Sequence, residues 1–152
     1  MVKMPEAINL SAKITDQLPG ELVNFMQVAG EVVQRQGQKL YLVGGVVRDL
    51  LLERANFDLD LVLEGDAISL ARELANIKQG KVTPHPHFGT AKLQWANWSV
   101  DLTTARSETY PKPCVLPTVK PASIKEDLFR RDFTINTMAI ELNPGHYGQL
   151  LA

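Results

Sequence analysis

The chain has 152 residues, of which 45% are hydrophobic, and its sixteen basic and seventeen acidic residues leave a net charge of -1. This length and apolar content suit one globular domain with a single core, and the charge gives no sign of the basic surface that a long nucleic-acid footprint requires. A single cysteine, Cys114, has no partner for an internal disulfide, which fits a reducing compartment. Because no stretch resembles a leader peptide or reaches the roughly 20 apolar residues of a membrane span, we expect a cytoplasmic protein.

The spacing of apolar residues in the first half of the chain predicts alternating helices and strands. The expected elements are, in order, a helix over 21–36 ending at Gly37, a strand over 39–43, a Gly44-Gly45 turn, a helix over 46–53, a strand over 57–63 and a helix over 66–78. In the last of these strands acidic and aliphatic side chains alternate.

Beyond Gly80 the period becomes that of strands, and the chain is predicted to finish as a mixed α/β domain. The expected elements are strands over 81–83, 90–95 and 99–103 with a hairpin turn at Ala96-Asn97, a long surface loop over 107–122, a helix over 123–131 and a strand over 136–142. Four prolines in the segment 107–122 predict that it forms no regular ladder. A capping box, Ser123 with Glu126, opens the helix that follows.

Three carboxylates are candidates for a metal site. Asp58 and Asp60 stand at positions i and i+2 of one predicted strand, so their side chains project to the same face. Asp101 lies between Val100 and Leu102, and it completes a triad if its strand neighbours the first. Two magnesium ions about 4 Å apart on such a triad could activate a ribose 3′-hydroxyl and stabilise a pyrophosphate leaving group. The alternative is a solvated strand face.

The Gly44-Gly45 turn is a candidate phosphate cradle. A turn that leads into a helix offers unpaired backbone N–H groups, and glycine keeps no side chain in the way of a phosphate. Arg48, one turn into the helix, adds a cation, and Asp49 is positioned to orient the guanidinium through a salt bridge. A plain strand-to-helix turn is the alternative reading.

A third cluster follows the predicted helix over 123–131. Arg130 and Arg131 could cradle a triphosphate, while Asp132 or Asn136 could bond ribose hydroxyls or a base edge. Alternatively, the arginines only complement the dipole at the helix end. The segment His85-Pro86-His87 has a spacing used in zinc sites, but without a third ligand nearby we favour a loop or strand edge.

Four motifs occur along the chain in a fixed order: Val43-Gly44-Gly45-x-x-Arg48-Asp49, Asp58-x-Asp60, Asp101-Leu102-Thr103-x-x-Arg106, and Arg130-Arg131-Asp132-Phe133-Thr134-Ile135-Asn136. Together they resemble the catalytic head of the class II tRNA nucleotidyltransferase and bacterial poly(A) polymerase family. This family belongs to the polymerase-β-like nucleotidyltransferase superfamily. The resemblance therefore implies a head with a five-stranded mixed sheet flanked by helices.

The resemblance also implies a reaction and its residues. The side chains implied to hold magnesium and act in catalysis are Asp58, Asp60 and Asp101. Those implied to bind the nucleotide are Gly44, Gly45, Arg48, Arg130, Arg131, Asp132 and Asn136. The implied reaction is attack of a tRNA 3′-hydroxyl on the α-phosphate of CTP or ATP, with release of pyrophosphate.

By the same resemblance, residues 39–152 form the head and residues 1–38 a helical segment packed on it. Family members continue into helical neck, body and tail domains, which select the nucleotide and hold most of the tRNA. We therefore expect an excised head, or one that works with a separately encoded helical partner or by self-association. Poly(A) addition uses the same head. A noncatalytic nucleotide- or partner-binding module and a small transferase acting on protein or antibiotic are further alternatives.

Overall fold

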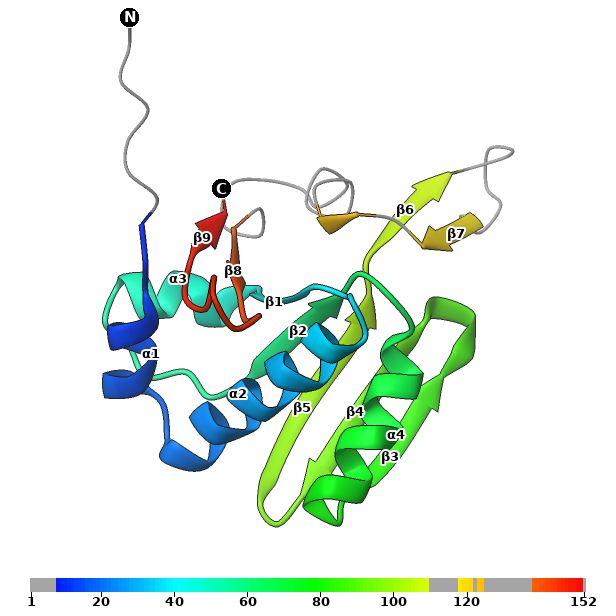
Figure 1. Cartoon of the computed structure of the whole chain (residues 1–152), viewed down its shortest axis with the longest axis horizontal. Coiled ribbons are helices and arrows are strands. Elements are labelled where there is room, and N and C mark those ends of the chain that lie inside the picture. Colours follow the sequence, from blue (N-terminus) through cyan, green and yellow to red (C-terminus); the bar gives the residue numbers. More distant parts are fainter. Residues whose placement is uncertain (1–7, 110–117, 122, 125–137, 152) are drawn as a thin grey trace, which may run out of the picture.

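The computed structural model describes residues 8–109, 118–121, 123–124 and 138–151. The helices of these residues are α1 (Ser11–Gln17), α2 (Gly20–Arg35), α3 (Gly45–Leu51), α4 (Ala67–Lys78) and a short 3-10 helix, η1 (Pro86–Phe88). The strands are β1 (Leu40–Val43), β2 (Leu59–Leu63), β3 (Lys81–His85), β4 (Thr90–Trp95), β5 (Trp98–Thr104), β6 (Arg106–Thr109), β7 (Thr118–Pro121), β8 (Ala139–Glu141) and β9 (Leu150–Leu151). The mixed α/β class expected from the sequence is confirmed (Figure 1).

Within the described residues, seven strands form one mixed sheet in the order β3-β4-β5-β2-β1-β8-β9. Strands β2 and β5 run parallel, and the other neighbours run antiparallel. The expected number of five strands is therefore wrong. Each of the six strands predicted along the chain has a counterpart, and β9 adds the seventh by pairing with β8. Two residues are too few for side-chain alternation to reveal such a strand.

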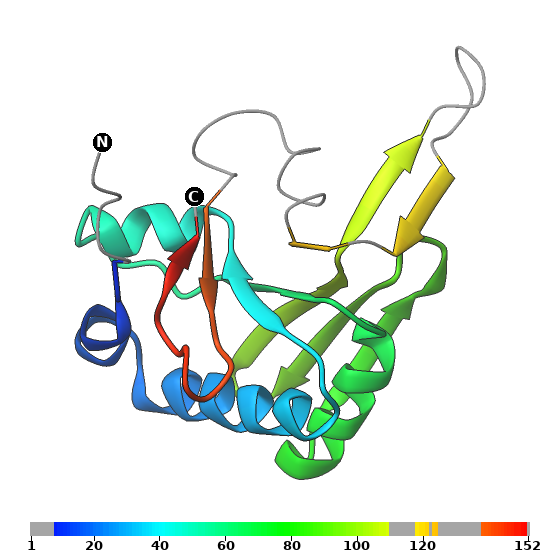
Figure 2. The same ribbon diagram turned by 45° about the horizontal axis from the view of Figure 1, so that its top comes forward.

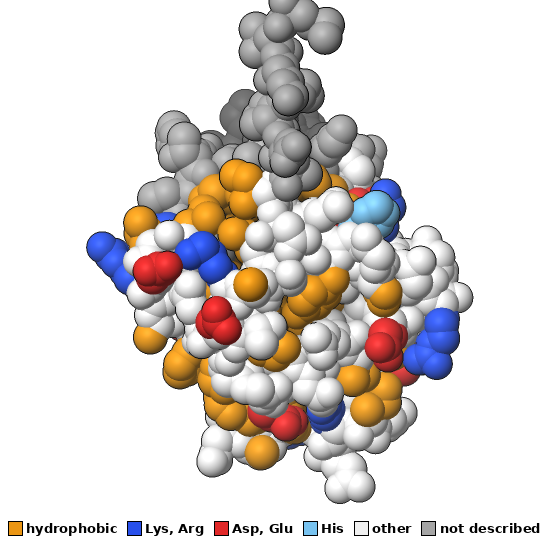
Figure 3. All heavy atoms as spheres, turned by 60° about the vertical axis from the view of Figure 1, so that its left-hand side comes forward, with side chains coloured by type: hydrophobic (Ala, Val, Ile, Leu, Met, Phe, Trp, Pro, Cys, Tyr) orange, Lys and Arg blue, Asp and Glu red, His pale blue; other side chains and the backbone are white. Residues whose placement is uncertain are grey.

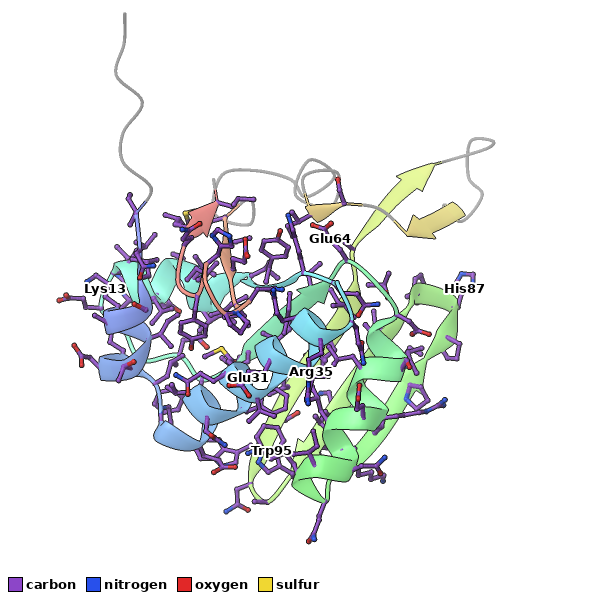
Figure 4. All side chains as sticks on the ribbon, in the orientation of Figure 1. Lys13, Glu31, Arg35, Glu64, His87 and Trp95 are labelled. Atoms are coloured by element: carbon purple, nitrogen blue, oxygen red, sulfur yellow. The ribbon has the colours of Figure 1, made fainter. Side chains whose placement is uncertain are left out.

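Helices α2 and α4 cover one face of this sheet, as the two ribbon views show (Figures 1 and 2). The predicted end of α2 is confirmed, because Gly37 follows it with a positive φ of 71° and its N–H donates to the carbonyl of Gln34 at 3.1 Å. Trp95 lies below α2 in the view of Figure 4. Its ring stacks on Phe25 of α2, with the ring centroids 4.6 Å apart. The main core thus lies between the helices and the sheet.

Side-chain alternation divides the central strands between the two faces. In β2 and β5 the aliphatic residues Leu59, Leu61, Val100 and Leu102 are buried in the main core. A second, smaller cluster of buried residues lies on the opposite face: Tyr41, Val43, Val62, Ala105, Ile124 and Ala139. Asp60 of β2 and the residues Ser99, Asp101 and Thr103 of β5 alternate with the main-core residues of these strands, so they project to the opposite face, which we call the open face.

The predicted surface loop over 107–122 is wrong in part, because β6 and β7 pair antiparallel from Arg106 with Pro121 to Thr109 with Thr118. Among the described residues this ribbon has two strands, and Pro121 stands at the end of the ladder, where a missing donor is tolerated. Pro111, Pro113 and Pro117 lie outside the described residues.

Helix α1 is not among the elements that the sequence predicts, and of the helix expected over 123–131 only Ser123 and Ile124 fall within the described residues. On the face in Figure 3, acidic and basic side chains are scattered rather than gathered by sign. None of the helices in the described part of the chain is long and apolar enough to cross a membrane.

Candidate active site

Asp60 and Asp101 stand side by side on the open face. Parallel pairing of β2 with β5 sets these two residues opposite each other in register. Their neighbours along each strand are buried aliphatic residues, so alternation turns both carboxylates away from the core. The sequence placed Asp101 with Asp58 and Asp60 only if its strand neighbours theirs. Because β5 is the neighbour of β2, this condition is met.

Asp58 stands one residue before β2 rather than within it. Its backbone N–H donates to Asn56 Oδ1 at 2.9 Å, which fixes the chain just ahead of the strand. Asp58 is exposed, and Asp60 is partly buried.

The Gly44-Gly45 turn lies directly against this acidic pair. Gly44 has φ +83° and ψ -159°, a conformation open to glycine but strained for other residues. A Cβ on Gly44 would stand 3.6 Å from Asp60 Oδ2, and one on Gly45 would stand 3.3 Å from Arg48 Nη2. The absence of side chains at the turn thus leaves its backbone between a carboxylate and a guanidinium.

Asp49 holds the guanidinium in place, as the sequence suggested. Arg48 donates from Nε to Asp49 Oδ1 at 3.0 Å and from Nη2 to Oδ2 at 3.2 Å. Asn56 Nδ2 donates to the same carboxylate at 2.7 Å. The hydrogen bonds from Arg48 and then Asn56 hold the pKa of Asp49 below its usual range, while the hydrogen bond to Asp49 raises the pKa of Arg48. Asp49 therefore links the turn to the loop that carries Asp58.

One pocket of about 410 Å³ collects these elements. The residues that line it are Gly45, Val46, Asn56, Asp58, Leu59, Asp60, Lys92, Ser99 and Asp101. All three predicted acids therefore face one hollow beside the glycine turn. We call this hollow the acidic pocket.

The chemistry of the acidic pocket suits a hard divalent cation, because carboxylate oxygens are the ligands that magnesium prefers. As the side chains are placed, no three His, Cys, Asp or Glu residues in the described ranges converge closely enough to hold a metal ion. Asp101 instead has Lys92 Nζ at 4.0 Å, across the β4–β5 ladder. The donor set and its shared pocket fit magnesium, and Asp58 and Asp101 are exposed enough to turn toward one.

Sequence reasoning missed several pocket residues. Asn56 carries no periodic signal because it lies in a loop. Lys92 was detectable in principle: the two-residue turn at Ala96-Asn97 pairs Trp95 with Trp98, and counting back along the ladder sets Lys92 opposite Asp101. The other predicted nucleotide-binding residues, Arg130, Arg131, Asp132 and Asn136, lie outside the described residues.

His85 and His87 occupy different elements. His85 is the last residue of β3, whereas His87 lies in η1 at the turn toward β4, at the sheet edge farthest from Lys13 (Figure 4). The sequence prediction that the His85-Pro86-His87 segment lies in a loop or at a strand edge agrees with the position of His85.

Comparison with known families identifies the class of protein. The family described as Poly A polymerase head domain matches residues 40–150, which include every element of the acidic pocket. The chain belongs to this family.

Curated relatives of the chain include proteins named as tRNA nucleotidyltransferases. The chain is 54% identical over 113 residues to the A-adding tRNA nucleotidyltransferase of Aquifex aeolicus, a match that covers 74% of this chain and 14% of that protein. It is 43% identical over 144 residues to the A-adding enzyme of Halalkalibacterium halodurans, covering 94% of this chain and 34% of the relative. The chain thus spans about a third or less of the length of these relatives.

The solved structures that resemble this chain include CCA-adding enzymes. A CCA-adding enzyme in apo form superposes with a TM-score of 0.88 at 39% identity, covering 97% of this chain and 35% of that one. The Thermotoga maritima CCA-adding enzyme complexed with tRNA gives a TM-score of 0.81 at 35% identity, with coverage of 97% and 33%. A CCA-adding enzyme in complex with CTP gives 0.82 at 34% identity, with coverage of 97% and 32%.

Proposed function

We propose that this chain is the catalytic head of a nucleotidyltransferase that transfers CMP or AMP from CTP or ATP to the 3′-hydroxyl of a tRNA. The observation that carries the proposal is the acidic pocket, which Asp58, Asp60 and Asp101 line together beside the Gly44-Gly45 turn. Relatives named as A-adding enzymes, and similar structures solved with CTP and with tRNA, support the same reaction class.

In this proposal each group of the pocket has a separate task. The backbone of the Gly44-Gly45 turn and the guanidinium of Arg48 bind the triphosphate, because Asp49 holds that cation beside the turn. Asp101 lies on the side of the pocket toward β4, where its carboxylate can accept the proton of an attacking hydroxyl.

Asp58, Asp60 and Asp101 would also hold magnesium. When bound, magnesium supplies Lewis-acid polarisation of the attacking and leaving oxygens. The pyrophosphate leaves as the new phosphodiester forms, and no side chain of the protein becomes covalently modified.

The test is incorporation of labelled CTP or ATP into a tRNA that lacks its 3′ end, with and without magnesium. We expect magnesium-dependent incorporation that falls by at least 100-fold in Asp58→Ala and in Asp60→Ala, since each loses a carboxylate on which transition-state stabilisation depends. Asp16→Ala is the matched control, because it removes an exposed carboxylate from α1.

Other outcomes identify the alternatives. Repeated addition of AMP to any RNA 3′ end would make the chain a poly(A) polymerase head, which the family description also fits. Absent incorporation at high protein concentration with retained ATP binding would indicate a noncatalytic nucleotide- or partner-binding module. Transfer to a non-RNA acceptor would replace the tRNA proposal altogether.

The proposal includes the organisation of the chain. Residues 39–152 are taken as the head and residues 1–38 as a helical segment packed on it, supported by the burial of Ile14, Leu22 and Phe25 in the main core. A cytoplasmic location, consistent with the lone Cys114, is part of the same proposal.

A further inference from the structure

The open face carries polar side chains in rows that cross the strands. One row, which we call the middle row, contains Lys92, Asp101 and Asp60, paired in register from β4 to β5 to β2. The next row along the strands contains His85, Thr90 and Thr103, paired from β3 to β4 to β5. Because same-face residues are two apart on each strand, the rows lie about 7 Å from each other.

Two pockets share the middle row. The acidic pocket lies on one side of it, toward Asn56, Asp58 and the glycine turn. A second pocket of about 260 Å³ lies on the other side, and the residues that line it are Asp60, His85, Thr90, Ala91, Lys92, Asp101 and Thr103. Asp60, Lys92 and Asp101 therefore stand between two hollows.

The two hollows differ in chemistry. The acidic pocket has three carboxylates, and the Arg48 guanidinium lies against the Gly45 turn at its rim. The second pocket lacks Asp58 and adds an imidazole and two hydroxyl groups, from His85, Thr90 and Thr103. These groups, with the ammonium of Lys92, are donors suited to one phosphate and to the hydroxyls of a ribose.

We propose that the second pocket holds the 3′-terminal ribose of the acceptor RNA and its phosphate, with Lys92 and His85 as the phosphate contacts. This inference rests on the proposed function, because a transfer between two substrates needs a place for each on opposite sides of the reacting acids. The triphosphate occupies the acidic pocket, and the acceptor hydroxyl approaches Asp101 from the side of β3 and β4. Thr90 and Thr103 face the ribose.

Lys92 has two partners in this arrangement. Without RNA its ammonium lies 4.0 Å from Asp101 Oδ1. Both side chains are about half exposed, so this ion pair is weak and is readily exchanged for a phosphate. On exchange, Lys92 retains a negative partner while Asp101 becomes available to the attacking hydroxyl.

The experiment is a pair of NMR titrations of the ¹⁵N-labelled 152-residue chain, one with the dinucleotide CpC and one with ATP and magnesium. CpC is expected to shift the amides of Thr90, Lys92 and Thr103, whereas ATP is expected to shift those of Gly44 and Gly45. His85→Ala and Lys92→Ala should each weaken CpC binding at least tenfold. His85→Ala, whose side chain lines only the second pocket, should also leave the dissociation constant of ATP within twofold of the parent.

The chain offers matched controls. His87→Ala removes the other histidine of the His-Pro-His segment, which does not line the pocket, and Lys81→Ala removes a lysine on β3 that lines neither hollow. Both controls should bind CpC as the parent does. Lys92→Arg keeps a cation at this position, so it should retain CpC binding within threefold. If Lys92 served only to pair with Asp101, CpC binding would not depend on this positive charge.

The two arms separate the two proposals. If ATP shifts no resonance near the glycine turn, the acidic pocket does not bind the nucleotide. That result would overturn both the proposed function and the acceptor pocket. If ATP binds there but CpC produces no shift at millimolar concentration, or shifts the glycine turn instead, the acceptor pocket alone is overturned. The same holds if His85→Ala and Lys92→Ala bind CpC like the parent.

Discussion

The acidic pocket depends on the backbone geometry of Gly44. Its positive φ of 83° with ψ -159° lets β1 turn into α3 while the chain passes close to Asp60. In Gly44→Ala we expect a loss of about 1–3 kcal/mol in the free energy of unfolding, because an L side chain is strained in this region. Urea denaturation measures the loss, and an ATP titration should show weakened binding.

Gly20→Ala provides the comparison, since Gly20 opens α2 and no atom lies within 4 Å of its added Cβ. This control should be as stable as the parent or slightly more so. A Gly44→Ala chain with parental stability and ATP affinity would show that the turn relaxes freely.

Asp49 is expected to give the chain a pH-dependent contribution to stability. Hydrogen bonds from Arg48 and Asn56 depress its pKa in the folded state, so the ionised form stabilises the fold above the unfolded pKa of ~3.9. That contribution disappears as the pH falls through the lower folded pKa. The stability difference between the parent and Asp49→Asn should therefore be full at pH 7 and vanish in strong acid.

Urea denaturation of both chains between pH 2 and 7 checks this expectation. Asp16→Asn changes the same charge on exposed α1 and should show no such pH-dependent difference. A constant gap between parent and Asp49→Asn at every pH would mean that the ionised carboxylate is not what stabilises the network. Asp49→Asn should also weaken ATP binding, because Arg48 loses its anchor.

At the scale of elements, Asn143 joins the C-terminal end of the sheet to its centre. Its Oδ1 accepts from the N–H of Leu40 at 2.9 Å, and its Nδ2 donates to the carbonyl of Gln38 at 2.8 Å and to Gln34 Oε1 at 2.9 Å. The side chain is buried, with 3% of its surface exposed. It therefore ties the chain just after β8 to the start of β1 and the end of α2.

Asn143→Ala should lower the free energy of unfolding by about 2–3 kcal/mol, because the buried N–H of Leu40 and the partly buried carbonyl of Gln38 lose their partner. Denaturant unfolding followed by circular dichroism measures this. Asn24→Ala is the matched control on the exposed face of α2 and should change stability by less than about 0.5 kcal/mol. Equal effects from the two substitutions would contradict the role of Asn143.

For the whole molecule, ligand binding should appear as thermal stabilisation. A ligand at 100 times its dissociation constant contributes about 2.7 kcal/mol, which corresponds to a rise of roughly 5–10 °C in the Tm of a domain of this size. We expect this rise with ATP and magnesium, and its reversal when a chelator removes the metal. Differential scanning fluorimetry provides the measurement.

The double variant Asp58→Ala, Asp60→Ala should lose most of the rise, whereas Asp16→Ala should keep it. A rise of equal size in the double variant would place the nucleotide away from the acidic pocket. Independence from the chelator would argue that the carboxylates bind no metal with the nucleotide.

The local alternation of polar and apolar residues determined which side chains of the central strands face the core. Alternation of Asp60 with Leu59 and Leu61 separates acid from core in β2 wherever that strand lies, because successive side chains point to opposite faces. The hairpin at Ala96-Asn97 likewise sets the register of β4 on β5 from the sequence alone. Helix ends at Gly37 and Asp66 follow from capping chemistry.

Only the tertiary structure decided which strands are neighbours. The parallel border of β2 with β5 joins segments about forty residues apart, and it alone brings Asp101 beside Asp60. The pairing of β6 with β7, the strand β9 and the place of Asn56 are further cases, since none has a periodic signal. The physical reason is that periodicity is a local property of the backbone, whereas strand neighbours are selected by packing and hydrogen bonding between distant segments.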